Sequence, residues 1–278
     1  LSQRVRDGNR HDRAASLLKA LAVSSHSPHP HNLQTSIATM EEPTTLLSQL
    51  AGDESWPPNG EGWAPPALPP LATLAARCGP AFTAAAAALS GPTPRSNWII
   101  PGRLLAGGAP HDDLPQLAKA GVTRFVSLQA KGEARPYEDG VQRHFQPPAS
   151  IDRHHIVDQQ VTSDEQAASL AMRILRHVHA GETLYLHCRG GHGRTGTVAA
   201  LVLGIAYRLD GATALSTYQA LHDLRQQPCF AASGYEPTAS GDSCVALFPV
   251  QREQVLRLLQ RLDGAGDGAD DGGAAAAG

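Results

Sequence analysis

The segment 187–196, which reads HCRGGHGRTG, constrains this chain more than any other part of its sequence. Cys188 and Arg194 are separated there by five residues, of which three are glycines. Residues 183–188 have the pattern of a short buried strand, and residues 195–209 have that of an apolar helix. Glycines let successive backbone N–H groups point into one bowl, and a helix N-terminus favours a bound anion. The sequence therefore predicts an anion-binding loop between a strand and a helix.

Cys188 is the predicted nucleophile of this loop. In such settings the pKa of a cysteine falls from about 8.5 toward roughly 3.5–7.5, and a thiolate can carry a phosphoryl group covalently. Arg194 supplies a planar guanidinium that binds two phosphate oxygens at once, which a lysine cannot do. The hydroxyl of Thr195 is placed to hydrogen-bond the sulfur and improve it as a leaving group. A buried cysteine beside an unrelated surface arginine is the structural alternative.

The loop resembles the H-C-x5-R-[ST] signature of the cysteine-based protein tyrosine and dual-specificity phosphatases. Residues 96–107 are similar to the first hairpin of compact dual-specificity domains, and residues 120–128 to their next strand. The resemblance covers roughly residues 96–262. It implies that the chain hydrolyses phosphomonoesters, foremost in phosphoproteins, through a cysteinyl-phosphate, without a metal or another cofactor. It assigns phosphate binding to Arg189, Gly190, Gly191, His192, Gly193 and Arg194.

The reaction also needs a general acid that protonates the leaving oxygen. In the family this is an Asp about thirty residues before the cysteine, and Asp158 occupies that place after an apolar segment. Val157 stands where the family often has proline. Asp164 is the competing candidate, but Ser163 and Gln166 form a helix-capping pattern that gives Asp164 a structural role. A third alternative places the acid at neither residue.

Two further roles follow from the resemblance. His187, which precedes the nucleophile, is expected to hold the loop by hydrogen bonds without transferring protons. Segment 248–255 resembles the late segment that carries a water-positioning glutamine, with Gln251 the better match and Gln254 in reserve. The alternative for this segment is a helix that begins at Pro249 and exposes both glutamines.

Arg189 and His192 flank the predicted loop mouth, where the phosphoinositide-phosphatase branch carries two basic residues. Positive charge there would suit an inositol phosphate or a phosphoinositide headgroup, and the alternative is that both side chains simply face water. A rhodanese-type sulfurtransferase also uses a cysteine on an anion-binding loop, but the Arg194–Thr195 ending and the upstream acid disfavour it. A phosphate-binding pseudoenzyme is disfavoured because nucleophile, arginine and acid candidates are all present.

Composition narrows the class of partner and compartment. The net charge is −3 and no basic stripe is present, so nucleic acid is not an expected partner. The four cysteines lack C-x-x-C spacing, which disfavours a zinc site or a disulfide scaffold. A thiolate enzyme needs a reducing compartment, so a cytoplasmic location is expected, with a transit peptide before Met40 as the alternative. No apolar run approaches the ~20 residues of a transmembrane segment.

Three regions are expected along the chain. Residues 1–94 hold 12 of the 21 prolines and no tyrosine, and are expected to form a low-complexity, largely disordered arm, with short helices possible at 13–23 and 71–89. Residues 95–263 are expected to form the catalytic domain, which would fold without the arm. Residues 264–278 are expected to be a disordered Gly/Ala/Asp tail.

Within the domain, strand and helix patterns alternate. Strands are expected on both sides of Pro101–Gly102 and at 122–128, 152–158 and 183–188; helices at 111–120, 164–180, 195–209, 210–227 and 249–262; and loops at 129–150 and 228–248. The alternation predicts an α/β fold, with a mostly parallel central sheet flanked by helices on both faces. Asp158 and Cys188 both follow predicted strands, so they are expected to meet at the carboxyl edge of the sheet.

Overall fold

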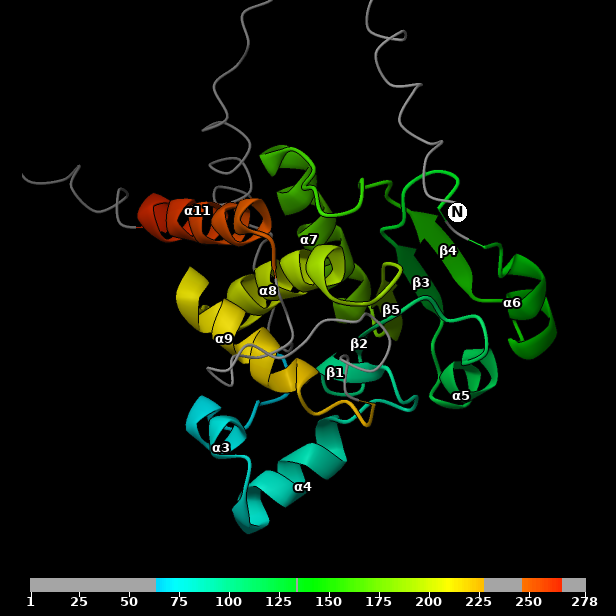
Figure 1. Cartoon of the computed structure of the whole chain (residues 1–278), viewed down its shortest axis with the longest axis horizontal. Coiled ribbons are helices and arrows are strands. Elements are labelled where there is room, and N and C mark those ends of the chain that lie inside the picture. Colours follow the sequence, from blue (N-terminus) through cyan, green and yellow to red (C-terminus); the bar gives the residue numbers. More distant parts are fainter. Residues whose placement is uncertain (1–63, 134, 228–246, 267–278) are drawn as a thin grey trace, which may run out of the picture. The chain divides into compact units, whose positions relative to one another are not determined.

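The structure is a computed structural model that describes residues 64–133, 135–227 and 247–266 (Figure 1). The expectations for the first 63 residues, for most of the loop at 228–248 and for the tail beyond 266 lie outside the described residues.

A five-stranded sheet forms the centre of the domain. Its strands are β1 (Ser96–Ile100), β2 (Leu104–Gly107), β3 (Arg124–Ser127), β4 (Ser150–Arg153) and β5 (Leu184–His187), in the order β1-β2-β5-β3-β4. Only the β1–β2 hairpin is antiparallel, while β5 pairs in parallel with both β2 and β3, and β3 pairs in parallel with β4. The expected mostly parallel sheet is confirmed.

Alternate strand residues point to opposite faces, and each face has its own apolar cluster. Leu105, Phe125 and Tyr185 pack with residues of α5 (Leu114–Lys119) and α6 (Glu138–His144). The opposite side chains, among them Leu104, Val126 and Leu186, belong to the larger cluster. That cluster includes residues of α7 (Asp164–His179), α8 (Gly193–Tyr207), α9 (Gly211–His222) and α11 (Pro249–Gly266). The expected helices on both faces are therefore present.

The local sequence explains where the main helices begin. The Ser163 hydroxyl accepts a hydrogen bond from the Gln166 N–H at the start of α7, as the capping pattern predicted. Asp210 accepts from the N–H groups of Ala212 and Thr213 at the start of α9. Helix α8 is buried from Arg194 to Gly204, so it is apolar on every side rather than along one stripe.

Three predicted elements differ from those observed. Strand β4 ends at Arg153, so Asp158 lies in the following loop and does not end a strand. The loop expected at 129–150 contains α6, because Tyr137, Val141 and Phe145 bury apolar side chains against the sheet. Helix α9 ends at His222 rather than at 227, since Leu224 and Arg225 continue in turns beneath the anion loop.

The expected start of the domain at residue 95 is too late. Residues that were assigned to the arm form α3 (Leu71–Ala76) and α4 (Gly79–Leu89), which contact α9 and β1. Leu74 and Leu89 are each 2% exposed and belong to the larger apolar cluster. The packing of this segment on the domain was not evident from the sequence. The segment is proline-rich, and only a few of its leucines are buried. At the other end, α11 continues through Gly266, beyond the expected boundary at 263.

No single helix within the described ranges is long and apolar enough to cross a membrane. Helices α8 and α9 reach the length and composition of a span only when counted together, and the chain bends by 116° between them.

Candidate active site

The predicted anion loop connects the end of β5 to the start of α8, at the carboxyl edge of the sheet. Cys188 follows the last residue of β5 and is a free cysteine, 3% exposed. The Gly191 N–H donates a hydrogen bond to the Cys188 sulfur at 3.3 Å. Because α8 begins at Gly193, its N-terminus lies within the same loop as the sulfur. The expected strand–loop–helix arrangement around the nucleophile is present.

Gly191 is required at its position for two reasons. Its φ of +77° is a conformation that residues with a side chain rarely adopt. A Cβ on Gly191 would also collide with the backbone of Gly107 and Gly108, at the end of β2. The Ala109 N–H donates to the Arg189 carbonyl at 3.0 Å. The β1–β2 hairpin therefore supports the loop by direct backbone contact.

A buried arginine holds the underside of the loop. Arg225 is 7% exposed and donates to the Gly191 carbonyl at 3.1 Å, to the Asn97 Oδ1 at 2.8 Å and to the Ala106 carbonyl at 3.3 Å. The Tyr218 hydroxyl also donates to the Gly191 carbonyl, at 3.2 Å. These contacts connect the loop to α9, β1 and β2, so its shape is fixed by three separate elements.

Arg194 is held in a fixed orientation by a carboxylate. Its Nη1 and Nη2 atoms donate to the two carboxyl oxygens of Glu133 at 2.5 and 2.7 Å, a bidentate pair, and Nη1 also donates to the Ile156 carbonyl at 3.0 Å. Burial alone would lower the pKa of Arg194, but the Glu133 hydrogen bonds and the facing charges of Cys188, Glu133 and Asp158 raise it above its ordinary value. The guanidinium therefore stays charged within the site.

Two polar atoms of the residues at the start of α8 have no hydrogen-bond partner within the described residues. They are the Nε of Arg194 and the Oγ1 of Thr195, both buried. An unpaired buried donor costs free energy unless a ligand or a reacting group satisfies it. The Nε is the donor that a phosphate oxygen would take up, and Thr195 remains the candidate that stabilises the sulfur.

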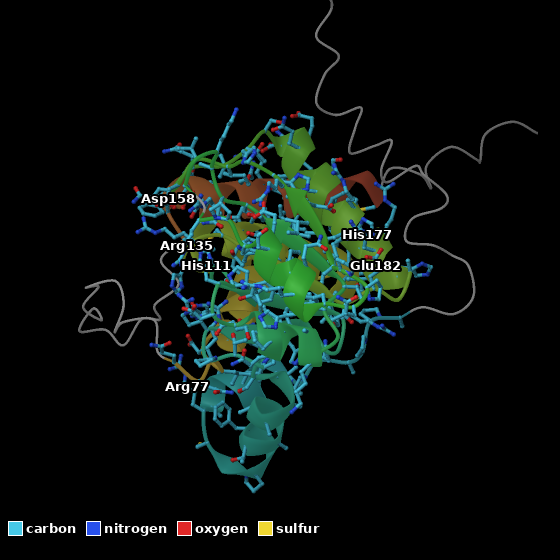
Figure 2. All side chains as sticks on the ribbon, turned by 90° about the vertical axis from the view of Figure 1, so that its right-hand side faces the viewer. Arg77, His111, Arg135, Asp158, His177 and Glu182 are labelled. Atoms are coloured by element: carbon cyan, nitrogen blue, oxygen red, sulfur yellow. The ribbon has the colours of Figure 1, made fainter. Side chains whose placement is uncertain are left out.

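Asp158, the predicted acid, lies at the site. Its Oδ1 is 2.9 Å from the Nη2 of Arg194, while its side chain is 62% exposed. Asp158 lies on the same side of the domain as His111 and Arg135 and opposite the pair formed by His177 and Glu182 (Figure 2). The carboxyl group therefore borders both the phosphate position and solvent, where a leaving oxygen would emerge.

Asp164, the competing acid, binds side chains of α11. Its carboxylate accepts hydrogen bonds from Arg257 at 2.7 and 2.8 Å, from Arg261 at 3.1 Å and from Gln254 at 3.1 Å. The Arg257 hydrogen bonds, the first of several causes, hold the pKa of Asp164 below its ordinary value. The side chain of Asp164 is thus joined to α11, whereas Asp158 is the carboxylate that lies beside Arg194. The geometry favours Asp158.

His187 supports the loop, as expected. It is fully buried, and its Nε2 lies 2.8 Å from the Tyr137 hydroxyl, while its Nδ1 lies 3.2 Å from the Cys188 carbonyl. Burial lowers the pKa of His187 to about 4, so the ring is neutral at neutral pH. It therefore orients the backbone at the nucleophile.

The two basic residues expected at the loop mouth differ from each other. Arg189 is exposed there. After the Arg194 hydrogen bonds, its charge is one of the further causes that lower the pKa of Glu133. His192, in contrast, turns inward, and its Nδ1 lies 3.1 Å from the Nε2 of His222. Burial, together with the charges of Arg225 and Arg95, lowers the pKa of His192 to about 4. His192 is therefore neutral and partly buried, and Arg189 is the basic side chain exposed at the loop mouth.

The two candidate glutamines are both buried, so the alternative of a helix that exposes them to solvent does not apply. A Cβ on Gly193 would lie 2.7 Å from the Gln251 Oε1, which places this amide against the anion loop. Gln251 also donates to the Gln160 carbonyl at 3.1 Å. Gln254 instead donates to the Thr162 carbonyl at 2.8 Å, near the far end of the loop 154–163 that carries Asp158, called the acid loop below. Gln251 is the glutamine that reaches the site.

Sequence reasoning missed several residues that build the site. Glu133 and Tyr137 lie in the segment that was predicted as a loop, and Arg225 lies near the end of a predicted helix. Their partners are at least 34 positions away in the sequence, and for Arg225 up to 128 positions away. No local period or motif marks such contacts. The one available signal was the set of buried aromatic residues in the supposed loop 129–150.

The chain belongs to a known family of phosphatase domains. A family model described as "PTP-SAK: Swiss Army Knife protein, DSP-PTPase phosphatase domain" matches residues 93–239, just over half of the chain. This match confirms the resemblance to cysteine-based, dual-specificity-like phosphatases that the loop indicated.

The chain is also similar to individual named proteins. The chain is 29% identical over 136 residues to "Putative tyrosine phosphatase 067L" of Invertebrate iridescent virus 3, over 47% of this chain and 55% of the viral protein. The chain thus spans about half the length of this curated relative. Among solved structures, Tk-PTP in its active form is 23% identical, covers 60% of this chain and 97% of its own, and has a TM-score of 0.46. Human DUSP28 is 19% identical, with 63% and 99% coverage and a TM-score of 0.44.

Proposed function

We propose that this domain is a protein phosphatase that hydrolyses phosphotyrosine, and also phosphoserine or phosphothreonine, through a cysteinyl-phosphate. One observation carries the proposal: the Arg194 guanidinium is held by Glu133, and its buried Nε has no partner in the part of the chain that the structure describes. A planar cation with a free donor beside a nucleophile matches the needs of phosphoryl transfer, in which positioning and charge stabilisation dominate.

The first step forms a covalent intermediate. The Cys188 thiolate attacks phosphorus, an S–P bond forms, and the bond from phosphorus to the leaving oxygen breaks. Asp158 gives its proton to that oxygen, so the substrate leaves as a neutral alcohol or phenol. The loop N–H groups and Arg194 bind the three phosphoryl oxygens throughout.

The second step releases phosphate. A water molecule oriented by Gln251 attacks phosphorus, and the Asp158 carboxylate accepts the water proton. The P–S bond breaks, and Cys188 leaves as a thiolate that the Gly191 N–H and the Thr195 hydroxyl stabilise. Asp158 thereby regains the proton that it gave up in the first step, and its 62% exposed side chain stays in contact with solvent.

Cys188→Ser tests the covalent route. The exchange removes the thiolate but keeps the loop, so turnover of para-nitrophenyl phosphate should disappear while inorganic phosphate still binds. Calorimetry measures the binding, and trapping of acid-quenched cysteinyl-phosphate in the unmodified chain identifies the intermediate. Residual turnover at the normal rate in the Ser variant would exclude this mechanism.

A phosphatase for inositol phosphates or phosphoinositide headgroups is the second candidate. Arg189 at the loop mouth favours it, but His192 does not add the second charge. A panel of phosphopeptides, inositol phosphates and phosphoinositides, compared by kcat/KM, decides between the substrate classes. Sulfur transfer from thiosulfate to cyanide by the same chain would instead support the rhodanese-type alternative.

We place the active protein in a reducing compartment, foremost the cytoplasm. The proposal rests on the free thiol of Cys188, which must stay reduced to act. Fractionation of cells that express the full-length protein is the test, and recovery from an oxidising compartment would contradict it.

A further inference from the structure

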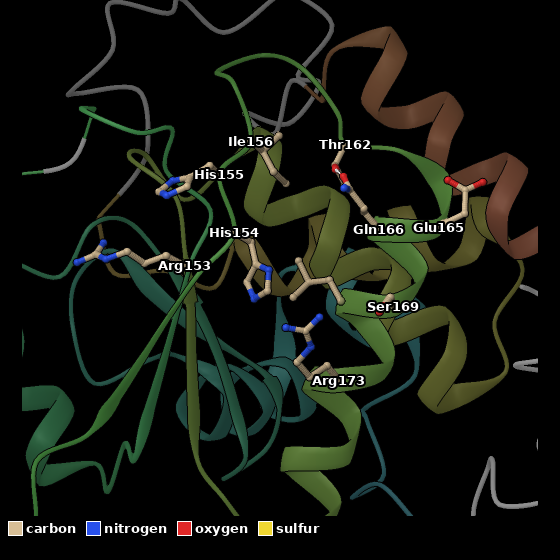
Figure 3. A pocket seen from close by; sticks show the side chains of 10 residues that line it. Arg153, His154, His155, Ile156, Thr162, Glu165, Gln166, Ser169 and Arg173 are labelled. Atoms are coloured by element: carbon tan, nitrogen blue, oxygen red, sulfur yellow. Dashed lines mark hydrogen bonds between the residues drawn. The ribbon is translucent and has the colours of Figure 1, made fainter. Parts of the chain in front are cut away.

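A hollow lies beside the acid loop, on the side that faces α7 (Figure 3). Its volume is about 570 Å³, which is large enough for a small organic molecule. The lining comes from both ends of the acid loop, at His154–Ile156 and at Thr162, and from α7 between Glu165 and Arg173. None of these residues has a role in the proposed reaction through its side chain.

Some of the charged side chains around this hollow form ion pairs and others do not. Arg153 forms an ion pair with Glu138, and nearby Asp152 pairs with Arg124. Arg173, by contrast, has no ion pair within the described residues and is exposed. Glu165 is the carboxylate among the residues that line the hollow. Eight residues of helix, about 12 Å, separate it from Arg173. The end of the hollow at Arg173 therefore carries an uncompensated positive charge.

Neutral hydrogen-bonding groups lie next to that charge. The His154 ring points toward Arg173, and Gln166 and Ser169 lie along the same side of α7 (Figure 3). Burial, followed by the nearby charge of Arg173, lowers the pKa of His154, while Asp152 opposes the shift and His155 adds to it. A neutral imidazole beside this guanidinium can hydrogen-bond to an anion without adding a second positive charge to the site.

The hollow is also connected to the catalytic arginine. The His154 N–H donates to the Ser127 carbonyl at 2.8 Å, which fixes the start of the acid loop to β3. The carbonyl of Ile156, whose residue lines the hollow, accepts from the Arg194 Nη1 at 3.0 Å. At the other end of the loop, the Thr162 hydroxyl is hydrogen-bonded to Gln166. A molecule in the hollow would touch both ends of the segment that carries Asp158.

We propose that this hollow binds a small organic anion, with a carboxylate or a phosphate monoester on Arg173 and His154 and a polar body along Gln166 and Ser169. Bound there, the anion restrains the acid loop and changes the rate of the step that uses Asp158. The binding site stands on its own contacts, and only the effect on rate rests on the proposed function.

Binding is tested with citrate and glycerol 3-phosphate as the two anion sources. The full chain carrying Cys188→Ser is used, so that the phosphate ester is not hydrolysed. NMR titration of the His154 ring should show a saturable shift with at least one probe, because the anion offsets the charge of Arg173. The probe with the lower Kd identifies carboxylate or phosphate as the preferred group.

Arg173→Gln is the decisive variant, and Arg176→Gln is its matched control on the same helix, since Arg176 is exposed but does not line the hollow. The loss of one charge-assisted contact should weaken binding by about 10-fold or more in Arg173→Gln and leave Arg176→Gln unchanged. Equal affinities in the two variants, or no saturable His154 shift with either probe, would overturn the site.

The effect on rate is measured in the chain that retains Cys188. Saturating citrate should change kcat for phenyl phosphate, which needs the acid, more than kcat for para-nitrophenyl phosphate, which has a better leaving group. The difference should disappear in Arg173→Gln. Purely competitive inhibition, equal for both substrates, would refute the coupling. A chain with no turnover at all would refute the proposed function while leaving the NMR result in force.

Discussion

At the scale of single residues, Arg194 shows how a charge can be buried and still be available. Its side chain is 1% exposed, and Glu133 together with two backbone carbonyls occupies its terminal nitrogens on one side. Among the described residues, the Nε has no hydrogen-bond partner. The ion pair thus orients the cation and does not consume all of its donors.

Glu133→Gln tests this orientation. The variant keeps the shape of the side chain but removes the charge, so Arg194 loses its bidentate partner and part of its alignment. A loss of about 10- to 100-fold in kcat/KM for para-nitrophenyl phosphate is expected, because charge-assisted contacts contribute about 1.5–3 kcal/mol. Glu182→Gln, which removes a carboxylate on the opposite side of the domain, is the control for a general loss of stability. Equal activities in the two variants would contradict the role of Glu133.

Asp158→Ala tests the acid. The variant should slow hydrolysis of phenyl phosphate by about 10²–10⁴-fold and that of para-nitrophenyl phosphate less, because a good leaving group needs no proton. Asp164→Asn should leave both rates close to normal, since that carboxylate is bound to α11. If Asp158→Ala slowed both substrates equally, the residue would be acting through Arg194 and not as a proton donor.

At the scale of elements, α3 and α4 belong to the folded domain. Leu74 is almost fully buried in the larger apolar cluster, and α3 lies against α9, the helix whose C-terminal end leads into Arg225. The Ser90 hydroxyl also donates to the Leu224 carbonyl at 2.7 Å. This segment therefore supports the region beneath the anion loop.

Leu74→Ala measures that support. Removal of a buried leucine side chain costs about 2–5 kcal/mol of unfolding free energy, which urea denaturation of the full chain can quantify. Thr83→Ala, at an exposed position of α4, is expected to change the value by well under that amount. A small, equal effect of both changes would show that α3 is not part of the cooperative unit.

Elements with a strong local signal could be predicted from the sequence, and those that depend on distant contacts could not. Short stretches of sequence are enough to predict the periodic helix α7, the capped start of α9 and the glycine loop. Helix α6 was not expected, and the helices expected as possible at 71–89 were assigned to the arm, because the apolar partners of Val141 and Leu74 lie far along the chain. The same distinction holds in the site, where Cys188 was evident and Glu133 was not.

At the scale of the whole molecule, two neutral histidines connect acidity to stability, the fully buried His187 and the partly buried His192. Burial lowers the pKa of both His187 and His192 to about 4, from an ordinary value of 6.5. Between these values the unfolded chain binds more protons than the folded one, so the unfolding free energy rises with pH in that window. Stability should therefore be complete above about pH 6.5 and decline as the pH falls toward 4.

Melting temperatures of the parent chain and of His192→Leu, recorded from pH 7 to pH 5, test this linkage. The variant should lose a smaller part of its Tm over that range, because one of the two groups no longer titrates. His144→Leu, at an exposed position of α6, is the comparison and should keep the slope of the parent. Identical slopes for His192→Leu and the parent would remove His192 from the explanation.

The meeting of Gly191 with Gly107 and Gly108 has a practical consequence for protein engineering. Two main chains touch there with no room for a methyl group, so the catalytic loop cannot be transplanted without the hairpin edge on which it rests. Attempts to redirect specificity should instead randomise rim positions such as Arg189 and Val157, where side chains project into solvent and new chemistry can be introduced without disturbing the scaffold.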